Sequence, residues 1–246
     1  MIDCISVENM RQSDAYTIEN FTPSLELMYR AAYGVFESVN WQGRIAIMAG
    51  SGNNGGDGYA LACILKEHGF DCTVYSLGSR LSKDAHHYAE IAKGMNVQII
   101  PFHSVGTLSG FDVVVDCLLG TGFQGSVRDD YRNAIEAINA SGAYVVSVDI
   151  NSGMNGDTGE AEIAVRSDIT VTIGYFKTGL ITERAGEYIK QLVCVDIGIV
   201  LFRKENLICS CDEWKDICQR SGIHSFRASV QNDGQTYFLA PDWLKL

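Results

Sequence analysis

The chain alternates short apolar runs with helical segments, and this alternation constrains its fold more than any other feature. The runs are rich in β-branched residues and bounded by glycine, as expected of buried strands in a parallel sheet. Seven runs have this character: Ile45–Ala49, Cys72–Leu77, Val97–Phe102, Val113–Leu118, Tyr144–Ile150, Ile169–Ile173 and Leu192–Ile199. Helical segments separate the earlier runs: Tyr59–Glu67, Asp84–Lys93 and Asp130–Asn139. The pattern predicts a doubly wound, Rossmann-like α/β fold of three layers, with a mainly parallel sheet between helices.

The two ends of the chain differ from this alternating middle. Apolar residues recur every three or four positions over the first forty residues, which predicts helix, and Thr22–Ser24 supplies a helix start between two pieces. After Val200 the sequence becomes polar, with one amphipathic helix at most and a final strand and turn within Gln235–Leu246. We therefore expect a domain over residues 1–205 and, over residues 206–246, a C-terminal extension that packs on it or acts as a linker.

Composition excludes several classes of function. A formal net charge of −11 argues against a nucleic-acid partner, because that affinity comes mainly from clustered Lys and Arg. No apolar run reaches the length of a membrane span, and the N-terminus lacks the apolar core of a signal peptide. The eight cysteines lack the spacing of a zinc site, so we expect them to be reduced. The sequence favours a cytoplasmic protein without a membrane partner.

The first predicted strand leads into GSGNNGGDG (50–58), whose glycines spell G-x-G-x-x-G before a helix expected to begin near Asp57. Such a turn lets the backbone approach a phosphate group. A dinucleotide dehydrogenase also needs a carboxylate after its second strand, and here that strand ends VYSLGS, with none. Asn53, Asn54 and Asp57 either cap the helix or bind a ligand. Two amides and a carboxylate exceed what capping requires, which favours the ligand.

Two aspartates end later strands in the same way. Asp116 precedes a glycine-rich loop that begins at Gly120, and Asp149 precedes a loop that contains Ser152. Each aspartate could simply hydrogen-bond its own loop, but together they would converge at the carboxyl ends of the strands. There they offer oxygen ligands for a hard cation and a carboxylate for proton transfer. Lys177 follows another strand and is either a functional cation or a solvated surface lysine, whereas we expect Asp196 to be structural.

Four segments in the same order resemble the YjeF N-terminal domain family, whose characterised enzymes are NAD(P)H-hydrate epimerases. They are GNNGGDG (52–58), VVDCLLGTG (114–122), SVDINSGMNGDTG (147–159) and GYFKTGL (174–180). The resemblance runs from MRQSDAYTIE near the N-terminus to Asp196–Ile199. The sequence departs from the family at Ser51 and Asn151, where proline is usual.

The resemblance implies a function and a set of site residues. The implied substrate is NADHX or NADPHX, a nicotinamide dinucleotide whose ring has added water, and the implied reaction interconverts its R and S epimers for a partner dehydratase. It also implies a homodimer and a potassium ion around Asn54, Asp116 and Ser152. Epimerisation moves a proton on and off, and we expect Asp149 to be the acid/base; Lys177 is a second catalytic candidate. Substrate contacts are expected at Asn53, Asn54, Gly55, Gly56, Asp57, Gly120, Thr121, Gly122, Phe123, Gln124, Gly125, Ser126, Tyr131 and Asp149.

Two other classes of protein compete with the epimerase. One is a non-catalytic dimerisation scaffold, because the same domain occurs in an enhancer of mRNA decapping. That class would be expected to lose the acidic and amide residues, whereas Asn54, Asp116 and Asp149 are all present. The other is a conventional nicotinamide-dependent oxidoreductase, which the missing ribose carboxylate disfavours.

Overall fold

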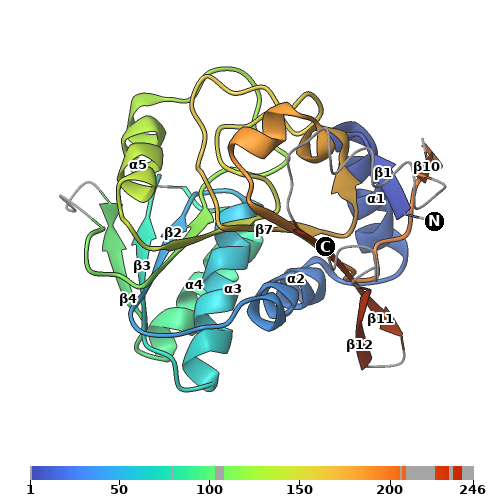
Figure 1. Ribbon diagram of the computed structural model, residues 1–246. Helices are drawn as coiled ribbons and strands as arrows, with labels where there is room; N and C mark the ends of the chain where they lie inside the picture. Colours follow the sequence, from blue (N-terminus) through green and yellow to red (C-terminus); the bar gives the residue numbers. More distant parts are fainter. Residues whose placement is uncertain are drawn as a thin grey trace.

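The computed structural model describes residues 2–78, 80–102, 108–205, 207–208, 225–232 and 235–239, with side chains from residue 4 to residue 205. Each of the seven predicted runs forms a strand, and each of the three predicted helical segments forms a helix (Figure 1). The fold is therefore the predicted doubly wound α/β sandwich.

The helices are α1 Val7–Asn20, α2 Ser24–Ser38, α3 Asn53–Glu67, α4 Lys83–Gly94 and α5 Asp129–Asn139, with short 3-10 helices η2 Thr178–Ile181 and η3 Arg184–Glu187. The strands are β1 Ile2–Ile5, β2 Ile45–Ala49, β3 Cys72–Ser76, β4 Gln98–Pro101, β5 Val113–Cys117, β6 Tyr144–Val148, β7 Ile169–Ile173, β8 Phe176–Lys177, β9 Gln191–Val195, β10 Leu207–Ile208, β11 Ser225–Asn232 and β12 Gln235–Leu239.

The order of strands in the main sheet fixes where a ligand can bind. The order is β12-β11-β9-β7-β6-β5-β2-β3-β4, and every pairing is parallel except that of β11 with β12. From β2 the chain proceeds through β3 to β4 on one side, and from β5 through β6 and β7 on the other. The direction of winding thus reverses between β2 and β5. In open α/β sheets a ligand crevice forms at this point, outside the carboxyl ends of the strands.

Strand β2 shows why an apolar run becomes a central strand. Its side chains alternate between the two faces, and all five residues are buried. Ile45 and Ile47 pack into the core beneath α2, α3 and α4, whereas Ala46 and Met48 pack into the core beneath α5. A strand with apolar neighbours on both faces cannot alternate polar and apolar residues, which explains the continuous hydrophobic sequence.

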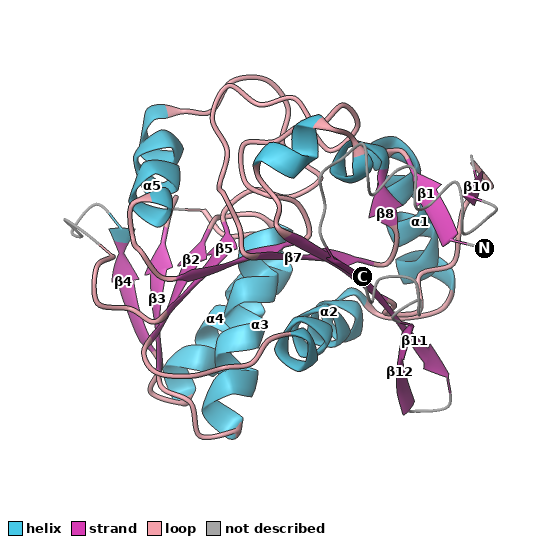
Figure 2. Cartoon of the chain, viewed as in Figure 1, coloured by secondary structure: helices cyan, strands magenta, loops and turns pink. Residues whose placement is uncertain are grey.

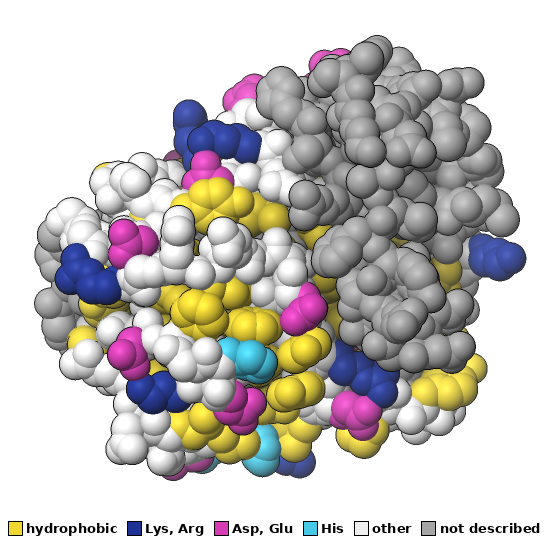
Figure 3. Space-filling model, turned by 60° about the horizontal axis from the view of Figure 1, so that its bottom comes forward, with side chains coloured by type: hydrophobic (Ala, Val, Ile, Leu, Met, Phe, Trp, Pro, Cys, Tyr) yellow, Lys and Arg dark blue, Asp and Glu magenta, His cyan; other side chains and the backbone are white. Residues whose placement is uncertain are grey.

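The helices form two layers around the sheet. Helices α2, α3 and α4 cover one face, and α5 lies on the other with η2 and η3 (Figure 2). The side turned forward in Figure 3 shows apolar side chains interspersed with charged and histidine side chains. Within the described chain, no helix combines the length and hydrophobicity that a membrane crossing requires.

The ends of the chain differ in part from the prediction. The described N-terminus begins with strand β1, which pairs with β8, and only then enters the predicted pair of helices. β1 has four residues, too few for a period of two to be distinguished from a helical one. Near the C-terminus β12 covers the first part of the predicted strand, whereas the predicted amphipathic helix lies outside the described residues. The domain boundary at residue 205 stays a prediction.

Candidate functional site

A cavity of about 730 Å³ opens where the winding of the sheet reverses. Its wall contains the loops after β2 and β5, Asp149 directly after β6, and residues of α1 and α2. The volume lies within the range of small-molecule and cofactor sites. The first two polar loops singled out in the sequence, and Asp149 of the third, thus converge on one cavity.

Three glycines of the first loop bring helix α3 close to strand β5. A Cβ at Gly50 would overlap the carbonyl oxygen of Leu118, and one at Gly55 would overlap the carbonyl oxygen of Gly50. A Cβ at Gly58 would lie 2.9 Å from that of Cys117. The helix begins at Asn53, not near Asp57 as predicted, because the glycine-rich sequence masks the first turn. No side chain caps this helix, so its first N–H groups remain for an anionic ligand.

Asn54 is buried beside the loop that follows β5. Only 9% of the residue is exposed, and its Nδ2 donates a hydrogen bond to the carbonyl oxygen of Leu119 at 3.0 Å. Its Oδ1 atom is buried without a hydrogen-bond partner among the described residues. A buried, unpartnered amide oxygen is costly, and a bound cation would supply what it lacks.

Asp116 is the centre of a saturated hydrogen-bond network. Its carboxylate accepts four hydrogen bonds: from Ser152 Oγ at 2.5 Å, Ser152 N at 2.9 Å, Ser147 Oγ at 3.0 Å and Leu118 N at 3.2 Å. Burial raises the pKa of Asp116, and the hydrogen bonds from Ser152, Leu118 and Ser147 oppose that rise. The carboxylate therefore ties the loop after β5 to the loop after β6 from behind the cavity wall.

Asp149 lies at the cavity wall immediately after β6. Its φ of 68° is in the left-handed region, which few residues other than glycine adopt. Oδ1 lies 2.5 Å from Lys177 Nζ, and Oδ2 accepts a long hydrogen bond of 3.4 Å from the N–H of Thr121. A strained backbone with a fixed side chain is typical of residues that act on a ligand.

Lys177 is a buried cation and not a solvated surface lysine. It is fully inaccessible to solvent, and its Nζ donates to Ile173 O at 2.7 Å and to Thr172 Oγ1 at 3.0 Å as well as to Asp149. With three acceptors its hydrogen-bonding capacity is filled. Lys177 thus holds one oxygen of Asp149 from behind and does not itself line the cavity.

Most of the predicted substrate contacts share this cavity. Those on its wall are Asn53, Asn54, Asp57, Gly120, Thr121, Gly122, Phe123, Gln124, Ser126, Tyr131 and Asp149. Gly55 and Gly56 are instead buried within α3, where a Cβ at Gly56 would meet Met28. Asp116 and Ser152 are also fully buried, behind the wall.

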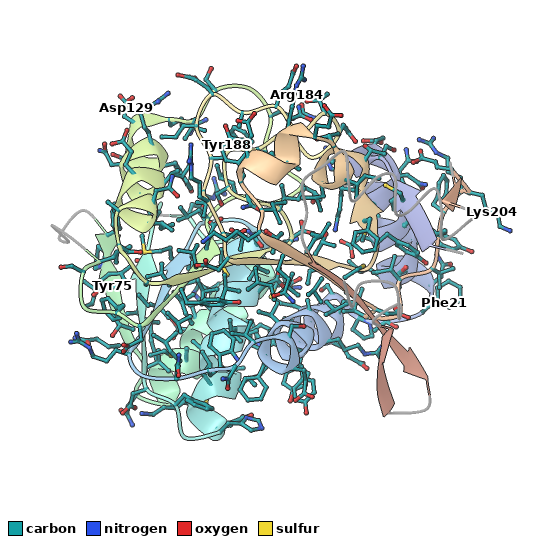
Figure 4. The ribbon with its side chains drawn as sticks, viewed as in Figure 1. Phe21, Tyr75, Asp129, Arg184, Tyr188 and Lys204 are labelled. Atoms are coloured by element: carbon teal, nitrogen blue, oxygen red, sulfur yellow. The ribbon has the colours of Figure 1, made fainter. Side chains whose placement is uncertain are left out.

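A second hollow of about 590 Å³ adjoins the cavity across the loop from Gly120 to Ser126. Phe123 and Gln124 line both, whereas Gly125 lines only the second. Arg184 and Tyr188, which also line it, are labelled in Figure 4 near η3. The loop therefore separates two hollows, and Gly125 faces away from the first.

Several cavity residues were not singled out in the sequence: Arg11, Asp14, Asp84 and Arg128. A signal for Asp14 was present. Met10, Asp14 and Ile18 are spaced four residues apart, lie on one face of α1, and all line the cavity. An acidic residue within an otherwise apolar stripe is the kind of exception that marks a site.

Burial and mutual repulsion favour the neutral form of two of these carboxyl groups. Burial raises the pKa of Asp57 well above its usual range, and the charges of Asp149 and Asp14 add to the rise while Lys177 opposes it. Burial also raises the pKa of Asp14; Asp149 and Asp84 add to this rise and Lys177 opposes it. A cavity with carboxyl groups in different protonation states can both donate and accept a proton.

The fold and the cavity define an α/β protein with a ligand crevice at its topological switch point. The chain belongs to the YjeF-related protein N-terminus family, whose model matches residues 24–179. This confirms the resemblance inferred from the sequence motifs.

Individual relatives agree with this assignment. The chain is 38% identical to an NAD(P)H-hydrate epimerase of Limosilactobacillus reuteri over 79% of its own length and 95% of that protein. It is 36% identical to the bifunctional NAD(P)H-hydrate repair enzyme Nnr of Coxiella burnetii over 85% of its own length, but that match spans 44% of the Coxiella protein. The yeast protein YNL200c has a similar fold, with a TM-score of 0.66 and 18% identity over 72% of this chain and 83% of that one.

Proposed function

We propose that this protein is an NAD(P)H-hydrate epimerase, which interconverts the R and S epimers of NADHX and NADPHX. The observation that carries the proposal is the setting of Asp149. Its backbone is left-handed, and a buried lysine fixes its carboxylate at the wall of a cavity large enough for a nucleotide. Two relatives named NAD(P)H-hydrate epimerase, matched over 95% and 96% of their own length, support it.

Asp149 carries the proton in this proposal. Epimerisation at the hydrated carbon requires either the C–O bond to break and re-form or the ring to open and close, and both routes move a proton on and off the hydroxyl oxygen. Lys177 holds Oδ1, so Oδ2 is the atom placed toward the cavity loop at Thr121. The role of Lys177 is to orient Asp149 and stabilise its charge, not to contact the substrate.

The first turn of α3 and the loop from Gly120 to Ser126 are proposed to hold the dinucleotide. Uncapped N–H groups at the start of α3 suit its phosphates, and Arg11 and Arg128 add positive charge at the cavity wall. These groups allow an acidic protein to bind an anionic substrate.

We also propose a potassium ion beside this substrate. The unpartnered Oδ1 of Asn54 lies in the same group of oxygens as Leu119 O and Ser152 Oγ, which are 3.2 Å apart, with the Asp116 carboxylate behind them. Amide, carbonyl and hydroxyl oxygens suit a hard cation. When bound, the ion would supply positive charge next to the substrate anion.

Thermal unfolding tests the potassium site without an activity assay. At constant ionic strength, we expect the melting temperature to rise with the potassium concentration more than with choline, because an ion that binds only the folded state stabilises it. Asn54→Ala should abolish this difference. Equal melting temperatures in the two salts for the natural protein would contradict the site.

The epimerase activity itself is tested with the purified protein and the R epimer of NADHX. In potassium buffer, we expect R and S to equilibrate faster than in the spontaneous reaction, as followed by chromatographic separation of the epimers. No acceleration by correctly folded protein would overturn the proposed function. The same assay with NADPHX would measure the preference between the two substrates.

A dehydratase is proposed to use the product of this reaction, in keeping with the bifunctional NAD(P)H-hydrate repair enzyme among the relatives. The homodimer and the cytoplasmic location stay predictions. Nothing in the described structure favours the scaffold over the enzyme, since the residues whose loss the scaffold predicts are present and connected.

A further inference from the structure

Helix α1 contributes a carboxylate to the cavity that the proposed mechanism has not used. Asp14 lies between Met10 and Ile18 on the face of α1 that lines the cavity. It is half-buried, and no hydrogen bond or ion pair to its carboxylate is found within the described residues. The same cavity holds the buried Oδ1 of Asn54, which has no hydrogen-bond partner among the described residues. The Asp14 carboxylate and this amide oxygen are therefore both available to a ligand.

The charges around Asp14 come from four other elements. Asp149 follows β6, Lys177 belongs to β8, Asp84 lies in the first turn of α4, and Asp57 lies in α3. Asp149 and Lys177 are paired with each other, which leaves Asp14 among carboxylates without a cation of its own. Arg11 on its own helix also lines the cavity, but it is exposed and forms no described ion pair with Asp14.

Burial and nearby charges favour the protonated form of Asp14. Burial and the charge of Asp149 raise its pKa, but they raise the pKa of Asp57 much further. The neutral form of Asp57 is therefore favoured more strongly than that of Asp14. The raised pKa of Asp14 favours its protonated form, which is the form that can donate a proton as a general acid.

We propose that Asp14 is a second proton-transferring residue of this cavity, which works with Asp149 on the two faces of the hydrated ring. The inference rests on the proposed epimerase function. Epimerisation replaces a hydroxyl on one face of the ring by a hydroxyl on the other. The reaction is therefore served by an acid that protonates the departing hydroxyl and a base that accepts a proton from the incoming water.

In the route through C–O cleavage, proton transfer accompanies both the breaking and the re-forming of the bond. The Asp14 carboxylic acid gives its proton to the substrate hydroxyl, the C–O bond breaks, and water leaves with the bonding electrons. The ring nitrogen lone pair forms a C=N bond to the emptied carbon. A water molecule then attacks the opposite face, and its proton passes to the Asp149 carboxylate as the new C–O bond forms. The reverse reaction uses the same two groups in exchanged roles.

The test compares Asp14→Asn with Glu8→Gln, a control on the exposed side of the same helix. Asn keeps the size of Asp14 but cannot transfer a proton. For Asp14→Asn we expect kcat to fall by about 100-fold at neutral pH, with KM and dinucleotide binding little changed. The decline of kcat at high pH, which reflects ionisation of the acid in the natural protein, should disappear. Asp14→Glu should recover part of the activity, and Glu8→Gln should match the natural protein.

The outcomes separate this inference from the proposed function. A natural protein without epimerase activity overturns the function. An active natural protein with an equally active Asp14→Asn variant overturns the inference alone. A loss of kcat with an unchanged pH profile also overturns it, because that result assigns Asp14 a structural role only.

Discussion

Asp116 and Asp149 occupy equivalent places in the sequence, each at the end of a parallel strand and before a glycine-containing loop, yet their surroundings differ. Asp116 is fully buried and accepts four hydrogen bonds, which leaves its carboxylate no free capacity. Asp149 keeps 13% of its side chain exposed and is held by Lys177 on one oxygen. Its backbone is left-handed, whereas that of Asp116 continues a regular strand.

At one edge of the sheet, the difference distinguishes a structural carboxylate from one that is placed to act on a ligand. A carboxylate whose oxygens are all occupied can only hold loops in place. A carboxylate with one oxygen anchored and the other near the cavity can act on a ligand without changing position, because its geometry is already fixed. The sequence pattern is the same in both, and the surroundings and backbone conformation of each group distinguish them.

The strongest test of this contrast is Asp149→Asn. Asn tolerates the left-handed backbone, so the fold should persist. We expect the epimerisation rate to fall by at least about 100-fold, with dinucleotide binding still measurable by calorimetry. Asp196→Asn, at the end of β9, serves as the control. Full activity in Asp149→Asn would remove Asp149 from its role.

The complementary change, Asp116→Ala, should act on stability. It leaves the N–H groups of Ser152 and Leu118 and the hydroxyl of Ser147 without their acceptor, and we expect the free energy of unfolding in urea to fall by about 3 kcal/mol. Asp196→Ala removes a carboxylate that accepts one described exposed hydrogen bond, from Gly198 N at 2.8 Å, and should cost under about 1 kcal/mol. Equal losses in the two variants would contradict the structural role of Asp116.

The smallest effect is expected from Asp57→Asn, which tests how the raised pKa of a wall carboxyl group affects stability. The pKa of Asp57 is raised in the folded protein, so the folded state binds a proton that the unfolded state has released, and stability is lost as pH rises from the unfolded pKa through the folded one. Asn cannot ionise. The variant should therefore gain about 2–4 °C in melting temperature at pH 8 relative to the natural protein, with the gain vanishing toward pH 4.

Asp71→Asn is the control for this series, because Asp71 is exposed and its pKa is lowered by Lys66. It should change the melting temperature by under about 1 °C at either pH. A gain for Asp57→Asn that did not depend on pH would mean that the effect comes from packing and not from charge.

The sheet could be predicted because every strand in its middle is buried on both faces, which leaves a continuous apolar run in the sequence. β2 and β5, with all residues buried, are the clearest examples. β1 and β8 were not predictable, since they have four and two residues and owe their conformation to each other. The start of α3 was missed because glycine disfavours helix on its own, whereas close packing against β5 selects it here.

For the candidate site, the loops were predictable and the partners were not. The rule that ligands bind at carboxyl ends of strands located Asp116 and Asp149 from sequence order alone. It could not reveal that Lys177 is buried, since a lysine in GYFKTGL has no local feature that distinguishes burial from exposure. Asn151 shows the same limit: it stands where the family usually has proline, and its side chain bonds to Val165 O and Ser167 Oγ, far along the chain.

The left-handed backbone at Asp149 also bears on how such a protein can change over generations. Asparagine and glycine are the residues that best accept this conformation, and both are reached from an aspartate codon by changing one base. Under the proposed role of Asp149, a single point mutation to asparagine would remove the proton-transferring group while the left-handed backbone of the loop is still accepted. A duplicated copy would then need only one base change to lose the proposed chemistry and keep the cavity, because the left-handed backbone at Asp149 also accepts asparagine.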